Sequence, residues 1–404
     1  MALLDAACAL APGHRLQISA IHIHHGLSPN ADAWAEFCSD QCARRGVPLA
    51  THRIALRRER STSLEARARK ARYERLLGAD VDVVALAHHA DDQAETLLLQ
   101  LLRGAGPHGL AAMPAFKPGR PALLRPLLAL TRDRLAAYAG ARGLSWIEDE
   151  SNADVSYVRN FLRREVAPLL RARFPGYPAT LVRAASHQAD AAALADALAG
   201  IDALEAVDAT GLSRARLAAL PPSRARNLLR WYLRERGLRS PSKARLADML
   251  RQLVAAADDA RIRIAQDGAE VGRYRDRIAV HAPAGEAFVR VWHGEPEVAL
   301  PSGVLAFAPT RGTGISAAKL EASQVTLRSR SGGERIRLAV NRPTRAVKKL
   351  LQEARLPAWE RQQLPLVWSD DELVAVPGIG VAVGFQSASG ETGWRIEWRP
   401  RWPA

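Results

Sequence analysis

The chain has 404 residues, which is enough for two or three domains, each with its own core. Its hydrophobic share of 48% and charged share of 25% are ordinary for folded proteins and exclude wholesale disorder. The net charge of +15 is not ordinary. A large basic excess favours a polyanionic partner, nucleic acid first, over a basic surface kept only for solubility.

Three cysteines are too few, and odd in number, for a disulfide framework, so they indicate a reducing compartment. The apolar opening, 1–11, has no basic start and is interrupted by Asp5, which argues against a signal peptide. No stretch approaches the roughly 20 apolar residues that span a membrane. We therefore expect a cytoplasmic protein.

The first part of the chain alternates strand and helix patterns. Residues 1–11 resemble most of an apolar helix without a cap, ended by Pro12-Gly13. Thr62 and Glu65 form a capping box at the start of another helix. Repeated strand and helix segments with short links predict an α/β fold with a doubly wound parallel sheet. Strands are predicted at 16–23, 49–56, 81–87, 123–128 and 146–149, and helices at 32–45, 62–77, from 88 onward, and at 131–142.

From Asn160 to about 253 the sequence is rich in Ala, Leu and Arg and lacks a strand signal, which predicts several helices. Prolines break them at 175–178, 221–222 and 239–241. Residues 260–310 alternate as short strands do. The tail predicts strands at 325–328, 336–340, 364–368 and 373–376 and a helix at 344–354. We therefore expect three domains: an α/β domain at 1–160, a mainly helical domain at 161–310 and a small α+β domain at 325–402.

The densest group of reactive side chains is HHADDQAE at 88–95, where a buried strand meets a helix. Open α/β sheets bind ligands at such junctions. On a helix, Asp91 and Asp92 share a face with Glu95. Carboxylates that converge at a helix N-terminus suit Mg²⁺, and the same terminus favours phosphate. The alternative is that these acids only complement the helix dipole.

A dinuclear metal hydrolase is a separate alternative. Its ligands would be His24, His25, His88, His89, Asp91 and Asp92. The helix at 62–77 has a basic face with Arg69 and Arg72, which that alternative explains only if the substrate is anionic. Either arginine alone is as typical of a solvated helix face as of a phosphate contact.

Four segments, in one order, closely resemble the tRNA(Ile)-lysidine synthetase family: IHIHHGLSPNADAW, SLEARARKARY, LAHHADDQAETLLLQLLRGAGPHGLAAM and SNADVSYVRNFLRREVAP. Residues 331–368 resemble that family's C-terminal domain. The resemblance implies an N-type ATP pyrophosphatase (PP-loop) fold. It also implies a ligase that adenylates the C2 oxygen of the wobble cytidine in tRNA(Ile) with a CAU anticodon. The amine of L-lysine then displaces AMP, and the tRNA changes from Met to Ile specificity.

The resemblance also implies roles for particular residues. Asp92 and Glu95 would act near Mg²⁺ or the lysine, and Arg69 would face the phosphate or the activated base. The expected nucleotide-binding residues are His24, His88, Asp91, Arg103, Gly104 and Gly106. The expected substrate and tRNA residues are Arg72, Asn152, Asp154, Tyr157, Arg159, Asn160, Arg163, Lys348 and Lys349. The basic helical and C-terminal regions would hold the tRNA chiefly by its phosphates.

The family's ATP loop reads SGGxDS and precedes its first helix. We expect that loop to lie before Met1, because 1–5 resembles the middle of this helix. Ser331-Gly332-Gly333-Glu334 is no substitute, since Arg335 and Ile336 stand where Asp and Ser are needed. Either the start site is assigned too late, or the chain is a non-catalytic tRNA-binding remnant. We expect the 404 residues alone to show little ligase activity. The sequence leaves open whether the protein is a homodimer.

Overall fold

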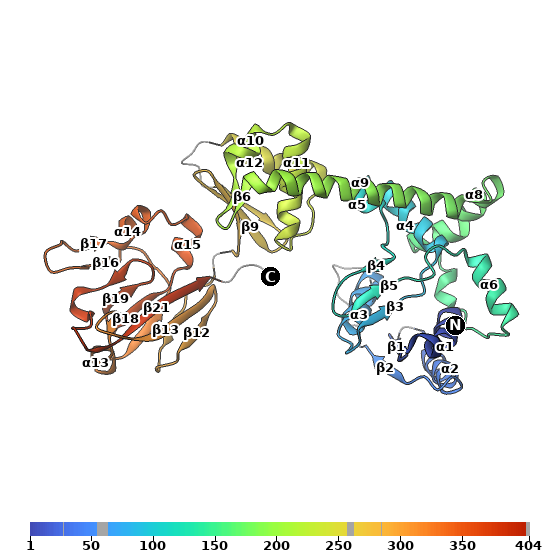
Figure 1. Ribbon diagram of the computed structural model, residues 1–404, viewed down its shortest axis with the longest axis horizontal. Coiled ribbons are helices and arrows are strands. Elements are labelled where there is room, and N and C mark those ends of the chain that lie inside the picture. The colour runs from blue at the N-terminus through green and yellow to red at the C-terminus, as the bar shows by residue number, and fades with distance from the viewer. Residues whose placement is uncertain (27, 55–63, 257–261, 284, 401–404) are drawn as a thin grey trace. The chain divides into compact units, whose positions relative to one another are not determined.

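The computed structural model describes the whole chain except residues 27, 55–63, 257–261, 284 and 401–404 (Figure 1). It contains two compact units, Met1–Leu194 and Ala195–Ala404. Helix α9 (Tyr177–Ala206) runs through the boundary between them. Among the described residues, no helix is both long enough and apolar enough to cross a membrane.

The first unit holds parallel strands in two separate sheets. Strand β1 (Ala20–His24) pairs in parallel with β2 (Leu49–Arg53). Strand β3 (Val83–Ala85) pairs in parallel with β5 (Ala122–Leu124), which also carries the short antiparallel β4 (Phe116–Lys117). The predicted α/β class is confirmed. The sheet is nevertheless divided in two, because no described strand lies between β1 and β3 and pairs with both.

Helices connect these strands and close a small core. That core contains Leu76, Val84 and Leu123, with Ile21 packed against them. Since Ile21 belongs to β1 and Val84 to β3, apolar packing joins the two sheets where backbone bonding does not. The helices are α1 (Ala2–His14), α2 (Ala31–Ala43), α3 (Leu64–Leu77), α4 (Ala90–Leu102), α5 (Pro107–Leu110) and α6 (Arg132–Ala141).

Some predicted boundaries in this unit are wrong. Helix α1 continues through Pro12 to His14, because a proline in the last turn removes only one backbone hydrogen bond. Residues 146–149 form no strand, and the Trp146 side chain is 54% exposed rather than packed in a sheet. The predicted cap Thr62 lies outside the described residues, and α3 is described from Leu64 onward.

A helical segment with one irregular turn follows the α/β part. Helix α7 (Val158–Phe161) continues through a π-helical turn, Leu162–Val166, into α8 (Ala167–Arg173). In the wide turn, the Ala167 N–H donates to the Leu162 carbonyl, five residues back. Pro168 has no N–H, so the next regular bond cannot form there. Single π turns are rare in proteins as a whole, and those that occur are often found at functional sites.

In the second unit, three helices pack on a five-stranded antiparallel sheet. Their core includes Leu228, Leu233, Leu246 and Ile278, all fully buried. The prediction of no strand before 253 is wrong at β6 and β7, which pair at one side of a sheet that later strands complete. The elements are β6 (Val207–Asp208), β7 (Gly211–Ser213), α10 (Arg214–Ala219), α11 (Pro222–Glu235), α12 (Lys243–Ala255), β8 (Ile262–Gln266), β9 (Ala269–Tyr274) and β10 (Arg277–His281).

The C-terminal part of this unit is α+β, as predicted, with two antiparallel sheets and short helices. The strand predicted at 336–340 ends at Ile336. The first sheet contains β11 (Val289–Val291), β15 (Val325–Arg328), β18 (Leu366–Ser369), β19 (Glu372–Val376) and β20 (Gly380–Val381). The second contains β12 (Glu297–Leu300), β13 (Gly303–Arg311), β14 (Ile315–Ser316) and β21 (Thr392–Pro400). The remaining elements are α13 (Ala317–Glu321), β16 (Arg335–Ile336), β17 (Arg345–Ala346), α14 (Val347–Glu353) and α15 (Ala358–Gln363).

One ring stack joins the C-terminal part to the preceding sheet. The rings of His281, at the end of β10, and Trp359, in α15, lie parallel with centroids 4.6 Å apart. Gly272 of β9 lies beneath them, and a Cβ there would come within 2.9 Å of both rings. Gln363 Nε2 donates to the Ala282 carbonyl at 2.8 Å. These contacts fix α15 against β9 and β10.

Candidate active site

The acidic cluster opens helix α4. His89 has an extended backbone (φ −128°, ψ −178°) and precedes the first helical residue. Its N–H donates to Asp92 Oδ2 at 3.1 Å, so the carboxylate satisfies a donor that the start of a helix would otherwise leave unpaired. The short link after β3 therefore places the acidic side chains at the carboxyl end of a parallel strand, as predicted.

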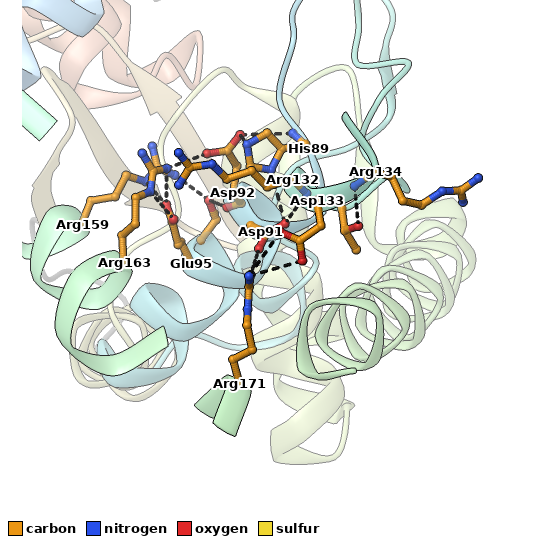
Figure 2. Close-up of polar contacts among 12 residues, drawn as sticks. His89, Asp91, Asp92, Glu95, Arg132, Asp133, Arg134, Arg159, Arg163 and Arg171 are labelled. Atoms are coloured by element: carbon orange, nitrogen blue, oxygen red, sulfur yellow. Dashed lines mark hydrogen bonds and ion pairs between the residues drawn. The ribbon is translucent and has the colours of Figure 1, made fainter. Parts of the chain in front are cut away.

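Arg163 binds both Asp92 and Glu95 (Figure 2). Its Nε donates to Glu95 Oε1 at 2.7 Å, and its Nη2 donates to Glu95 Oε2 at 3.0 Å and to Asp92 Oδ1 at 2.9 Å. Arg159 lies one helical turn earlier, with its Nε 3.3 Å from Glu95 Oε2. The π turn thus occurs in the segment that supplies both guanidinium groups.

Burial and the partner's charge have opposite effects on the pKa values of Glu95 and Arg163. Glu95 is only 4% exposed, and this burial raises the pKa of its carboxyl although the Arg163 guanidinium opposes the rise. Burial also works against the charge of Arg163, but Glu95 and Asp92 raise the pKa of its guanidinium overall. Glu95 is therefore a desolvated carboxylate whose charge depends on a bound cationic group.

Asp91 ties three helices together. Its Oδ2 accepts the Arg132 N–H, at the start of α6, at 2.8 Å, and its Oδ1 accepts Arg171 Nη2, from α8, at 2.8 Å. Arg171 Nη1 also lies 3.3 Å from Asp133 Oδ2 (Figure 2). Both Asp91 oxygens are thus engaged by protein donors. Arg171 was not predicted from the sequence, although it follows Arg163 by eight residues, about two helical turns.

A group of cationic side chains lies around His88. Burial lowers the pKa of His88 to about 4 against the pull of Asp92, with Arg125, Arg69 and Arg159 contributing in the same direction as burial. The imidazole is therefore neutral at pH 7. Its Nδ1 is buried and, among the described residues, has no hydrogen-bond partner.

Arg69 and Arg72 of α3 belong to the same neighbourhood. Burial, then the field of Arg69, lowers the pKa of Arg72, and Arg159 acts in the same direction. Burial followed by Arg72 lowers the pKa of His25, whose Nδ1 is also buried without a described partner. Neutral imidazoles beside mutually repelling guanidinium groups suit a bound anion, since an anion would relieve the repulsion and accept their hydrogen bonds.

His24 has a different environment from His25. It is buried at the end of β1, with its Nε2 3.2 Å from Asp32 Oδ1. Asp32 in turn accepts Arg53 Nη2, from β2, at 2.6 Å. His24, a predicted nucleotide-binding residue, thus contacts the start of α2, and no ion pair joins it to Asp92 and Glu95, the acidic pair, among the described residues.

Arg103, Gly104 and Gly106 lie at the far end of α4. Arg103 is the exposed residue that ends the helix, Gly104 follows with φ +68°, and Gly106 precedes α5. Arg103 follows Asp92 by eleven positions along the helix, which is roughly 16 Å at a rise of about 1.5 Å per residue. The structure therefore does not bring these three predicted nucleotide-binding residues to the acidic pair.

The predicted substrate residues divide into separate groups. Asn152, Asp154 and Tyr157 are exposed in the turn before α7, where Asn160 Nδ2 donates to the Asp154 carbonyl at 2.9 Å. Among the described side chains of that segment, only those of Arg159 and Arg163 form ion pairs with the acidic pair. The exposed Lys348 and Lys349 belong to α14 in the second unit.

The acidic pair does not fit a resident Mg²⁺ as it stands. All four oxygens of Asp92 and Glu95 accept hydrogen bonds, three from Arg163 and one from the His89 backbone. Arg163 already neutralises both carboxylates, so a dication would compete with its guanidinium for them. Within the described ranges, no three His, Cys, Asp or Glu side chains are arranged to hold a metal, so the geometry does not favour the dinuclear hydrolase alternative.

The loop at 331–334 binds its own carboxylate. The N–H groups of Ser331 and Gly332 donate to Glu334 Oε1 at 2.8 and 2.7 Å, and Glu334 is 7% exposed. Backbone N–H groups of this kind bind anions. Here an internal glutamate occupies them, which agrees with the rejection of this loop as a phosphate site.

Family models match three parts of the chain. A PP-loop domain matches residues 1–170, a TilS substrate binding domain 212–279, and a TilS substrate C-terminal domain 325–398. A tRNA(Ile)-lysidine synthase of Nitrosomonas europaea is 44% identical over 96% of this chain and 86% of the relative. One of Azoarcus sp. is 41% identical over 98% and 88%. A solved U34-tRNA thiolase from Methanococcus maripaludis covers 46% of this chain and 67% of its own, with 15% identity and a TM-score of 0.39, too low to argue a shared fold.

Proposed function

This chain belongs to the tRNA(Ile)-lysidine synthase family, and from that premise we propose that it ligates L-lysine to C2 of the wobble cytidine in tRNA(Ile) with a CAU anticodon. In this proposal the C2 oxygen attacks the α-phosphate of ATP, and pyrophosphate leaves. The lysine amine then forms a bond to C2, the C2–O bond breaks, and AMP leaves. The codon and amino-acid specificity of the product tRNA is then that of Ile instead of Met.

The observation that carries the proposal is the pairing of anionic and cationic groups at the start of α4. Asp92 and Glu95 bind a guanidinium, while Arg69 and Arg159 lie near both a neutral His88 and the Arg72 guanidinium. The first group suits the cationic end of lysine, and the second suits the phosphates of ATP. Negative charge builds on the phosphoryl oxygens while the α-phosphate is attacked. Arginines that repel one another gain most from this charge, so they stabilise the transition state more than the bound ATP.

Glu95 is the proposed proton acceptor for lysine. A free lysine amine has a pKa of about 10.4 and is protonated, hence non-nucleophilic, at pH 7. Burial raises the pKa of the Glu95 carboxyl, which makes it a better base than an exposed glutamate. Arg163 occupies this carboxylate, so lysine binding requires that guanidinium to move.

The nucleotide brings further expectations. Mg²⁺ would accompany ATP through its phosphate oxygens. We place the reaction in the cytoplasm, where ATP, lysine and tRNA are available. The exposed Asn152, Asp154, Tyr157, Lys348 and Lys349 and the loop residues Arg103, Gly104 and Gly106 stay candidates for tRNA or nucleotide contacts away from the acidic pair.

The test is ATP-dependent incorporation of labelled lysine into a tRNA(Ile) transcript with a CAU anticodon. The assay compares the 404-residue chain with a version extended through the codons upstream of Met1. Incorporation by either version that depends on Glu95, judged with Glu95→Gln, supports the proposal. Activity of the extended version alone would bear out the expectation that a preceding loop is needed. Failure of both versions under conditions where a family member is active would overturn the proposal.

A further inference from the structure

Arg125 carries a buried positive charge at the edge of the sheet where the acidic cluster lies. It directly follows β5, which runs parallel to β3 with Leu124 paired to Ala85. The Leu86 N–H donates to the Leu124 carbonyl at 2.8 Å, so the two strands end side by side. Arg125 and the start of α4 therefore lie at the carboxyl edge of these strands, where open α/β sheets bind ligands.

The Arg125 guanidinium has no anionic partner among the described residues, although Arg125 is only 6% exposed. Its Nη1 donates to the Pro114 carbonyl at 2.8 Å. Within the part of the chain that the structure describes, its buried Nε and its Nη2 make no hydrogen bond. By contrast, Arg163 uses these same two nitrogens to bind the Glu95 carboxylate. A buried charge without a counter-ion is costly, so the free side of this guanidinium suits an anion.

His88 lies near both Arg125 and the acidic pair. Burial has the largest effect on the pKa of His88 and lowers it, Asp92 opposes this effect, and Arg125 adds to it more than Arg69 does. Neighbouring charges act in this way from within about 6 Å. The Asp92 carboxylate and the Arg125 guanidinium are therefore no more than about 12 Å apart. A ligand that joins them needs a cationic end and an anionic end separated by several ångströms.

L-Lysine has this distribution of charge. Its side-chain ammonium and its α-carboxylate are roughly 7 Å apart when the molecule is extended. A carboxylate carries one negative charge and accepts two parallel hydrogen bonds from the planar fork of one arginine, so it matches a single buried guanidinium. A triphosphate carries several charges and is better matched by several cations, such as the exposed Arg69 and its neighbour Arg72.

We propose that Arg125 binds the α-carboxylate of L-lysine through its Nε and Nη2, while Asp92 and Glu95 hold the side-chain amine. The inference rests on the proposed function for the identity of the amino acid. It adds a residue that selects an amino acid over a simple amine, since an amine without a carboxylate would leave the buried Arg125 guanidinium unpaired.

The test compares the binding of related amines to the full chain by ligand-observed NMR. The probes are L-lysine, cadaverine, which lacks the carboxylate, and ε-aminocaproate, which keeps the carboxylate but lacks the α-amine. Because hydrogen bonds to a charged group are involved, we expect L-lysine and ε-aminocaproate to bind about 10- to 150-fold more tightly than cadaverine. Arg125→Met should remove this preference and leave the affinity for cadaverine nearly unchanged. Arg125→Lys, which keeps the charge, should retain part of the preference.

The matched control is Gln93→Leu, because Gln93 also fixes the segment that Arg125 contacts. Its side-chain amide forms two hydrogen bonds of 2.9 Å with the N–H and the carbonyl of Met113, next to Pro114. The loss of these bonds should change the affinities for all the probes by the same factor. If Arg125→Met behaves in this way too, Arg125 has only a structural role and the inference is overturned.

Two further results would overturn the inference. The first is equal affinity of the unsubstituted chain for L-lysine and cadaverine, or no binding of L-lysine. The second is weaker ATP binding by Arg125→Met with an unchanged preference for L-lysine over cadaverine, which would assign the guanidinium to the nucleotide. The proposed function is decided separately by the incorporation of lysine into tRNA, so it can stand when the inference fails. If neither the chain nor its extended version incorporates lysine, the proposed function fails and the inference with it.

Discussion

Removing the Arg163 guanidinium should loosen the start of α4 by an amount that depends on pH. Breaking a buried ion pair from one side costs about 3–5 kcal/mol. Arg163 keeps 30% of its side-chain exposure, and Arg159 Nε remains 3.3 Å from Glu95. We therefore expect Arg163→Ala to lower the free energy of opening of α4 by about 2–3 kcal/mol at pH 7.

The loss should be smaller in acid. Without Arg163, burial raises the folded-state pKa of Glu95 further above its unfolded value near 4.5. Between those two values the folded state binds more protons than the unfolded state, so stability falls as pH rises through the window. At pH 5 Glu95 in the variant is protonated to a greater extent, and the penalty for burying a charge is largely gone.

Hydrogen–deuterium exchange of the peptide that covers α4, Ala90–Leu102, measures this opening locally. A loss of about 2–3 kcal/mol corresponds to exchange roughly 30- to 150-fold faster than in the unsubstituted chain at pH 7. Arg164→Ala is the matched control, because Arg164 is the exposed neighbour. The reasoning is refuted if the two variants exchange alike, or if the acceleration by Arg163→Ala is greater at pH 5 than at pH 7.

Three further predictions concern other contacts. By NMR, His88 should titrate with a pKa of about 4. Between pH 6.5 and 4 the imidazole takes up a proton in the unfolded chain but not in the folded chain, so the stability of the folded chain should fall as the pH is lowered through this range. Arg171→Ala should speed exchange at the start of α4, since Asp91 loses a charged hydrogen bond worth about 1–2 kcal/mol. Gly272→Ala should lower the urea midpoint through an over-packing cost of about 1–3 kcal/mol, because its Cβ would meet two stacked rings.

Each of these predictions has a control. His88 is assigned with His88→Gln, and a midpoint at pH 6 or above would contradict its buried, cation-flanked position. For Arg171, the comparison is Arg173→Ala, an exposed arginine at the end of α8, and equal exchange in both would contradict the role of Asp91. For Gly272, the comparison is Gly200→Ala in α9, where a Cβ meets nothing within 4 Å. That change should stabilise the helix by up to about 1 kcal/mol.

Local patterns determined the elements whose signals lie within a few residues. The alternation of strands and helices indicated the α/β class, and strand 325–328 matches β15 because its alternation is short and clearly bounded. The acidic pair was also visible, since Asp92 and Glu95 are three apart on one helix. The prediction at 146–149 was wrong because a strand depends on a neighbour to pair with, and the sequence of one segment does not show whether that neighbour exists.

The tertiary structure decided which predicted residues meet. Asp92 and Glu95 share one cationic partner, Arg163, which lies 71 and 68 residues further along the chain, respectively, and Asp91 binds Arg171, 80 residues further along. His24 and His25 are adjacent in sequence, yet His24 contacts Asp32, whereas burial and then the charge of Arg72 lower the pKa of His25. The sequence therefore determined the family and the residue types of the site. Which charges neutralise one another depends on distances and burial, and these exist only once distant segments have packed together.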